Sequence, residues 1–399
     1  MAISGSDPFT TLPAELRVHI LISSGSLSTV SRHSKSARQH MMKWLNSQLP
    51  DPLTDNDGRL TSPDCLKDNG ERLASQLIKL HDQMIFYIED YITKATAYYP
   101  SREYLCLPQI HDAHGGRYLM FKGTKVVPQF DSARLTALEK SRFIKAFLMY
   151  TLTRKCDSVL YVYPKLRPRK VTKAEEEACF CIASYFRSLY GAIFAQCTDD
   201  AWLPSNPSAT SLQSGLLFPD NFYFEPDAYA MDMGFFTSRF SSFRNSFSAK
   251  FERLGPDRAA DFLRLDMAKE DERKALKARL QDIQANEQPP LRWDSYYDLF
   301  KSGLNYKNGC ESFIFEQLPL NRHDGLAWKV GKQRAWLFFD DRRFYPEETI
   351  ARPNLPSEAF LNEQPCKQAV IEGWFNNPGK ERALRRSQRW HDELMNTDK

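Results

Sequence analysis

The side chains best suited to metal or acid–base chemistry lie in one short segment, where His111, Asp112 and His114 precede Gly115 and Gly116. Two imidazoles and a carboxylate are ligand types that zinc accepts, with a fourth ligand supplied from elsewhere. A polar, glycine-rich loop explains the same residues without a metal. We therefore predict no metal site. A metal-dependent enzyme that uses the 111–114 loop is the catalytic alternative.

The cysteines also give no ligand pattern, because no C-x-x-C pair occurs among the eight of them. Cys179 and Cys181 are two positions apart, and on a helix such side chains diverge by roughly 200°. We expect buried free thiols. Scattered, unpaired thiols are typical of a reducing compartment, which predicts a cytoplasmic or nuclear protein. Met1 to Pro8 does not resemble a signal peptide, and no apolar run is long enough to predict a membrane span.

The paired carboxylates do not indicate catalysis. Asp199-Asp200 and Asp340-Asp341 stand where turns or caps favour aspartate. Glu175, Glu176 and Glu177 open a helical pattern, where the helix dipole favours negative charge. The chain also lacks the glycine-rich phosphate loops, the G-x-S-x-G motif and the H-E-x-x-H motif. We therefore expect neither a catalytic residue nor a cofactor, and a protein that is not an enzyme.

The elements that must position any site are mostly helical. Apolar residues recur at three- and four-residue steps in several segments, and Thr172-x-x-Glu175 is a capping-box pattern before a strongly apolar helix. Two short segments favour β-structure: a strand or hairpin over Tyr118 to Val127, and a strand over Arg334 to Phe339. We predict a mainly α, irregular multi-helix domain with at most a small sheet. Helices are predicted over residues 70–99, 132–155 with Asp131 or Ser132 as cap, 235–251 and 256–287, and behind the Thr172 capping box through Phe194.

Composition fits a globular protein and does not favour nucleic acid as a partner. Hydrophobic residues make up 42% and charged residues 26%, and 54 basic against 50 acidic residues leave a net charge of +4. Basic residues gather near the end of the chain. We interpret them as one solvated helix face, with a phosphate-binding patch as the alternative. They are Lys380, Arg382, Arg385, Arg386 and Arg389.

The N-terminal residues carry a recognisable pattern: Leu12-Pro13-Ala14-Glu15-Leu16, then Ile20-Leu21, Leu27 and Val30-Ser31-Arg32. This pattern resembles the F-box, which opens with Leu-Pro-x-Glu-Leu and later carries Val-Ser-Arg. A second likeness, to fungal F-box proteins, is the segment from Gly331 to Asp340 behind a long helical region. The resemblance divides the chain into an F-box-like helical segment, 1–45, a proline-rich linker, 46–69, and a helical body, 70–399, with a sub-boundary near 198–233.

The resemblance implies a non-catalytic protein–protein interaction module, a substrate receptor of a cullin–RING ubiquitin ligase. Its partners would be a Skp-type adaptor, which accepts an apolar helix face in a groove, and a target protein that the body recruits. The alternative is a helical protein whose N-terminal helices pack on its own domain and bind no adaptor. The residues implied in adaptor binding are Leu12, Pro13, Leu16, Ile20, Leu21, Leu27 and Val30.

Overall fold

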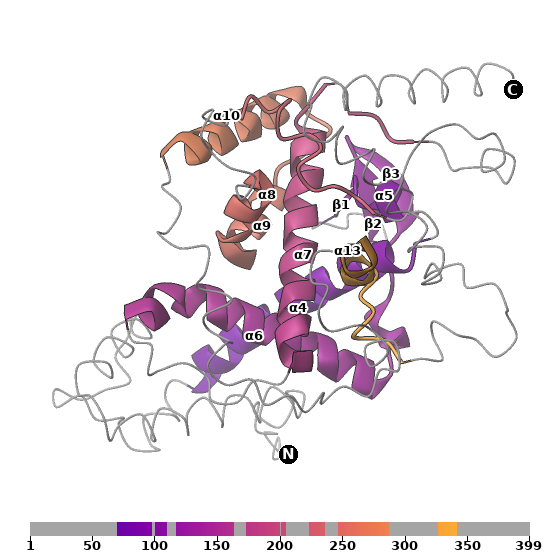
Figure 1. Ribbon diagram of the computed structural model, residues 1–399, viewed down its shortest axis with the longest axis vertical. Coiled ribbons are helices and arrows are strands. Elements are labelled where there is room, and N and C mark those ends of the chain that lie inside the picture. Colours follow the sequence, from indigo (N-terminus) through magenta and orange to yellow (C-terminus); the bar gives the residue numbers. More distant parts are fainter. Residues whose placement is uncertain are drawn as a thin grey trace, which may run out of the picture.

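The computed structural model describes residues 70–97, 100–109, 117–162, 173–199, 201–204, 223–235, 246–286 and 326–340. In this part of the chain the protein is mainly α-helical with one three-stranded antiparallel sheet, which confirms the prediction of a mainly α protein with a small sheet. Helix α7 (Lys173–Gln196) runs through the middle of the molecule (Figure 1). Helices α8 (Phe247–Glu252), α9 (Gly255–Leu263) and α10 (Glu270–Asn286) lie on one side of it, and α13 (Leu326–Gln333) and the sheet lie on the other.

The predicted helices over 70–99 and from the Thr172 capping box through Phe194 are confirmed as α4 (Gly70–Ala95) and α7. Each buries an apolar face. On α4 the residues that point inward recur at steps of three and four, as a single buried stripe requires. They are Met84, Tyr87, Ile88, Tyr91, Ile92 and Ala95, each 2% exposed or less. The stripe packs against α6 (Ala137–Val162) and α7, and Tyr87, Tyr185 and Phe186 meet edge to face between α4 and α7.

Helix α7 is long and apolar enough to cross a membrane. Of an 18-residue apolar stretch of this helix, however, 78% is buried inside the protein. Its Gly191 allows the segment 223–235 to approach closely, because a Cβ at Gly191 would lie 2.5 Å from the carbonyl oxygen of Pro226. The apolar character of α7 is therefore explained by its place in the core.

The N-terminal cap of α6 differs from the prediction. Asp131 does cap, but it accepts from the Ala133 amide and closes the short 3₁₀ turn η1 (Ser132–Arg134). Helix α6 itself begins with a capping box, in which the Glu139 amide donates to the Thr136 hydroxyl and the Thr136 amide donates to the Glu139 carboxylate. Asp340 also lies here and accepts from Thr136 and Arg142, as expected for a carboxylate near a helix start.

The hairpin predicted over Tyr118 to Val127 is confirmed as β2 (Tyr118–Phe121) and β3 (Thr124–Pro128). Strand β1 (Leu107–Pro108), next to the short helix α5 (Pro100–Glu103), pairs with the other edge of β2. The turn between β2 and β3 has positive φ at Lys122 and Gly123. A Cβ at Gly123 would lie 2.4 Å from that of Ala268, so glycine is needed for both conformation and space.

The predicted helix over 256–287 is wrong in its continuity, because α9 ends at Leu263 and α10 starts at Glu270. Of the predicted helix over 235–251, the structure describes α8 from Phe247 onward, while Phe235 lies outside any helix. Phe235 nevertheless stacks on Phe251, with ring centroids 5.6 Å apart. The described aromatic residues of this region, Phe235, Phe247 and Phe251, therefore belong to the core.

The strand predicted over Arg334 to Phe339 is wrong. Helix α13 ends at Gln333, and the chain then reverses through Ala335, whose φ is 55°. The amides of Ala335 and Trp336 donate to the carbonyls of Lys332 and Gly331, which is the Schellman pattern of helix ends. The missing Cβ of Gly331 leaves room for the Trp336 ring. The apolar residues that follow are buried by this reversal and not by a sheet.

Candidate functional site

The N-terminal residues implied in adaptor binding, from Leu12 to Val30, lie outside the described residues. The same holds for His111, Asp112 and His114 in the connection between β1 and β2, and for the basic residues at 380–389. Among the described residues, no group of three histidine, cysteine, aspartate or glutamate side chains could hold a metal ion. The remaining candidates for a functional site in this part of the chain are buried ionisable groups and cavities.

One buried ion pair lies at the centre of the core, between Asp90 and Lys94 on adjacent turns of α4. Their side chains are 0% exposed and 2.8 Å apart. Tyr185 of α7 donates to the same carboxylate oxygen at 2.7 Å. Burial raises the pKa of Asp90, and Lys94 opposes that rise. The pair joins α4 to α7 and is closed to solvent, which makes it a structural element and not a site for substrate.

A second buried carboxylate, Glu252, joins three helices. It is 1% exposed, accepts from the Tyr150 hydroxyl at 2.7 Å and pairs with Arg154, both on α6. Arg187 of α7 lies 3.9 Å away. Because the carboxylate is surrounded by the protein's own donors, it too holds helices together.

Glu177 of α7 faces Lys332 of α13, with 3.8 Å between the carboxylate oxygen and the ammonium nitrogen. The side chain is 5% exposed. Burial raises the pKa of Glu177 to about 7; Lys332 lowers it and Glu176 raises it further. The Lys332 ammonium also lies over the rings of Phe180 and Trp328. The contact between α7 and α13 therefore contains a carboxylate that titrates near neutral pH.

Replacing Glu177 by glutamine is expected to remove part of the pH dependence of stability. In the native protein the Glu177 carboxyl keeps its proton up to about pH 7. In the unfolded chain it loses the proton near the ordinary pKa of glutamate. The free energy of unfolding of the wild type therefore falls as the pH rises between these two pKa values. The variant stays neutral. Relative to wild type it should gain about 2–3 kcal/mol between pH 4 and pH 8, measured by urea unfolding across that range. A difference that does not change with pH would contradict this assignment.

The described thiols are poor nucleophiles. Cys106, Cys179, Cys181 and Cys197 are buried and form no disulfide, as predicted for Cys179 and Cys181. Burial raises the pKa of Cys197 to about 12, although Lys277, Arg273 and Lys122 act in the opposite direction. A neutral, covered thiol neither attacks a substrate nor binds a metal. Chemistry through these cysteines is therefore not supported.

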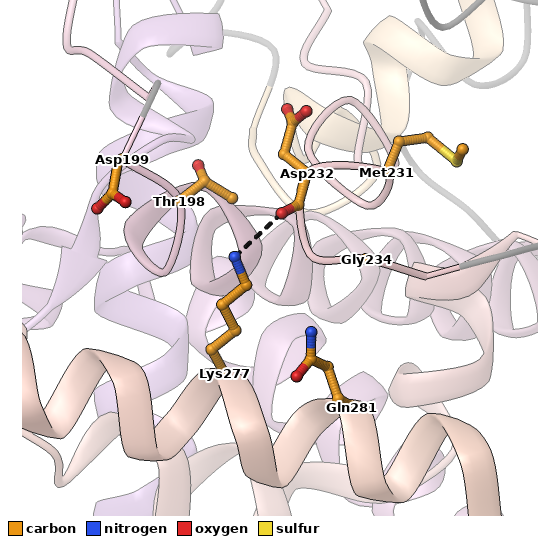
Figure 2. Close-up of a pocket in the computed structure, with 7 residues that line it drawn as sticks. All are labelled: Thr198, Asp199, Met231, Asp232, Gly234, Lys277 and Gln281. Atoms are coloured by element: carbon orange, nitrogen blue, oxygen red, sulfur yellow. Dashed lines mark hydrogen bonds between the residues drawn. The ribbon is translucent and has the colours of Figure 1, made fainter.

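A polar pocket opens where the chain leaves α7. Its volume is about 420 Å³, which is within the usual range for ligand sites. One wall comes from residues 198–199 and 231–234, and the other from α10, whose Lys277 and Gln281 rise toward it (Figure 2). The lining residues are Thr198, Asp199, Met231, Asp232, Gly234, Lys277 and Gln281.

One side of the pocket is the chain that follows α7, where the Lys122 ammonium donates to the carbonyls of Thr198 and Ala201 at 2.7 and 2.8 Å. These carbonyls lie beyond Gln196, the last residue of α7. Lys122 reaches them from the β2–β3 turn. This lysine therefore joins the sheet to the chain that leaves the central helix.

The other side is the turn over 227–235, to which no helix is assigned. Gly234 has a φ of 74°, and the amides of Gly234 and Phe235 donate to the carbonyls of Met231 and Ala230, again in the Schellman pattern. Two residues on successive turns of α10 donate to this turn: Lys277 to the Asp232 carbonyl at 3.1 Å and Gln281 to the Met233 carbonyl at 2.7 Å. The pocket thus lies between the chain after α7 and the turn over 227–235, whose carbonyls accept from Lys122 and Lys277.

The pocket carries both signs of charge. Its lining holds the carboxylates of Asp199 and Asp232 and the ammonium of Lys277, and Lys274 lies close enough to Asp199 to interact with it electrostatically. The sequence indicates a turn at Asp199 and gives no signal for Lys277 or Gln281. Thr198, Asp232 and Lys277 are far apart in the sequence, and only the fold brings them together.

Comparison with known proteins gave no match to a family model, a curated protein or a solved structure.

Proposed function

We propose that the protein is a non-catalytic interaction protein, in which residues 11–45 bind a Skp-type adaptor and the helical body recruits a target for a ubiquitin ligase. The observation that carries the proposal is the spacing of Leu12-Pro13-x-Glu15-Leu16 and Ile20-Leu21. Pro13 suits the first turn of a helix, and Leu16 and Ile20 would share one apolar face, as groove-binding helices do.

The described body supports a binding role more than a catalytic one. Its buried carboxylates Asp90 and Glu252 are engaged by the protein's own donors, and its described thiols are covered. The pocket beside α7 offers charge and hydrogen-bonding groups to a ligand but no described nucleophile. A receptor needs a rigid body with such a surface.

Adaptor capture tests the proposal. The purified chain is mixed with an immobilised Skp-type adaptor, next to the variant Leu16→Asp/Ile20→Asp. Burying a leucine or isoleucine contributes about 1.5–3 kcal/mol, so placing charge at both positions should weaken capture on the order of 100-fold or more. A matched control, Ser23→Asp/Ser26→Asp, adds the same charge to polar positions of the segment and should retain capture. Equal capture by all three proteins would remove the basis of the proposal.

A further inference from the structure

We propose that helix α10 (Glu270–Asn286) is a hinged cover, which swings away from the body as one unit about its N-terminal end while the rest of the described fold stays intact. This motion is separate from adaptor binding, because it depends only on the way α10 is attached. Three features of the attachment support it: little buried surface, contacts made by the ends of long side chains, and an incompletely packed seam.

Very little of α10 is buried. Of its 17 residues only Leu276 and Leu280 are buried, and Ile283 packs partly against the core. By contrast, five of the nine residues of α9 and four of the six residues of α8 are buried. Burial of apolar surface is the main force that holds a helix on a core. Helix α10 is therefore the most weakly held of these three helices, and a low density of buried contacts is what permits local opening.

The polar contacts between α10 and the body are hydrogen bonds from long side chains to backbone carbonyls. Lys277 and Gln281 donate to carbonyls of the turn over 227–235, and Lys250 of α8 donates to the Gln284 carbonyl at 2.7 Å. Each such bond contributes little net stability, because water can take the place of either partner when the two separate. The polar contacts can therefore be broken and remade at low cost.

The seam between α10 and the body is not closely packed. The polar pocket of about 420 Å³ lies along it, with Lys277 and Gln281 on the α10 side and Thr198 and Met231 on the other side (Figure 2). A polar space of this size has room for water. Water in the seam can replace the hydrogen bonds one at a time, so the helix does not have to lose all of them at once.

The start of α10 is attached more firmly than its end, which makes the motion a swing. The Arg273 guanidinium donates to the carbonyls of Met267 and Ala268 at 2.8 and 3.1 Å, and Met267 is buried. Ala268 also lies so close to the β2–β3 turn that a Cβ at Gly123 would come within 2.4 Å of its own. The C-terminal half of α10 therefore moves furthest.

Opening changes a defined part of the surface. The Arg279 guanidinium lies 5.1 Å from the centroid of the Phe262 ring, so a swing of α10 removes this cover from the ring. It also frees the carbonyls of Asp232 and Met233. The open form thus presents an aromatic ring and two hydrogen-bond acceptors that the closed form covers.

Hydrogen exchange of the full chain, followed by mass spectrometry in a series of urea concentrations below the unfolding transition, tests this inference. A detached helix of this length is marginal in water, so its amides exchange in the open form. We expect peptides from 272–284 to be protected at least 100-fold less than peptides from α7, with little dependence on urea. The protection of α7 should fall with urea, as global unfolding requires. Equal protection of both helices with the same urea dependence would overturn the inference.

Alanine substitutions distinguish detachment from melting of the helix in place. Lys277→Ala/Gln281→Ala removes both donors to the turn, while alanine raises the helix propensity. Each lost bond should increase opening about two- to tenfold, so detachment predicts that the protection of α10, measured relative to α7 in the same protein, falls about tenfold. Unchanged or greater protection would mean that the helix melts in place, and the inference would be wrong.

Asp282→Ala is the matched control. Asp282 is exposed, neighbours Gln281 and, in the described part of the chain, bonds only to Asn286 of the same helix. The substitution should not lower the protection of α10. If it lowers protection as much as Lys277→Ala/Gln281→Ala does, contacts with the body do not control the exchange, and the inference fails.

Discussion

Replacing Lys94 by methionine is expected to lower the free energy of unfolding by about 3–5 kcal/mol. The change preserves length and apolar volume but leaves the Asp90 carboxylate, 0% exposed, without its counter-charge. A buried charge without a partner is far more costly than the intact pair. Urea unfolding at pH 7, followed by circular dichroism, measures the loss. A loss below about 1 kcal/mol would show that Asp90 is neutral or reached by water.

The pair itself is expected to add little stability beyond that of a neutral pair. Lys94→Met/Asp90→Asn should therefore regain most of the loss, because asparagine keeps an acceptor for the Tyr185 hydroxyl without a charge. Acid should also rescue the single variant. Burial raises the pKa of Asp90, and removing Lys94 removes the main opposing influence, so lowering the pH neutralises the carboxylate and the deficit should shrink.

Replacing Glu252 by alanine is expected to cost a similar amount, about 3–5 kcal/mol. The substitution takes the carboxylate from Arg154, whose side chain is 7% exposed, and from the Tyr150 hydroxyl. It also loosens the attachment of α8 to α6 and α7, where Phe251 packs on Tyr190. Thermal and urea unfolding of the variant and the wild type measure the effect.

Two further substitutions test why Glu252→Ala lowers the stability. Glu252→Gln retains an oxygen acceptor for Arg154 and should lose less than Glu252→Ala, since alanine leaves the buried guanidinium without that partner, whereas the Tyr150 hydroxyl still has the backbone carbonyl of residue 252. Glu270→Ala removes an ion pair with Lys274 that is fully open to solvent, with side chains 67% and 74% exposed, and should leave the midpoint unchanged. If Glu270→Ala were as harmful as Glu252→Ala, burial would not explain the effect.

The regular parts of the fold could be predicted because their signals are local. The stripe from Met84 to Ala95 repeats at helical steps, and one turn with Gly123 joins two short apolar strands. The helix ends could be predicted less well. Helix α6 starts at the capping box of Thr136 and Glu139 and not at Asp131. This start could not be predicted, because both Asp131 and Thr136 are suitable cap residues and only the fold shows which turn each one caps.

The error at 334–339 has a definite cause. A short apolar run is compatible with a strand, a helix or a buried turn. Only the length of the run and the flanking glycine or proline residues distinguish these three structures. The position that reverses the chain is usually glycine, but here it is Ala335, so the usual stop signal is absent from the sequence. The reversal is held by tertiary contacts, in which the edge of one Trp meets the face of the other between Trp328 and Trp336.

The pocket could not be predicted for a related reason. Its walls come from the exit of α7, the turn at 227–235 and α10, and each contributes residues that are ordinary on their own. Lys277 and Gln281 read as exposed polar positions on a charged helix. Their roles depend on carbonyls of the turn at 227–235, more than forty residues earlier in the chain.

Formation of a stable complex with a Skp-type adaptor tests the central claim most directly. Equal amounts of the full chain and the adaptor are mixed and examined by size-exclusion chromatography with light scattering. The account predicts one species with the mass of a one-to-one complex, which Leu16→Asp/Ile20→Asp converts back to two separate proteins. Two separate species for a folded wild-type chain would contradict it and favour an N-terminal segment that binds no adaptor.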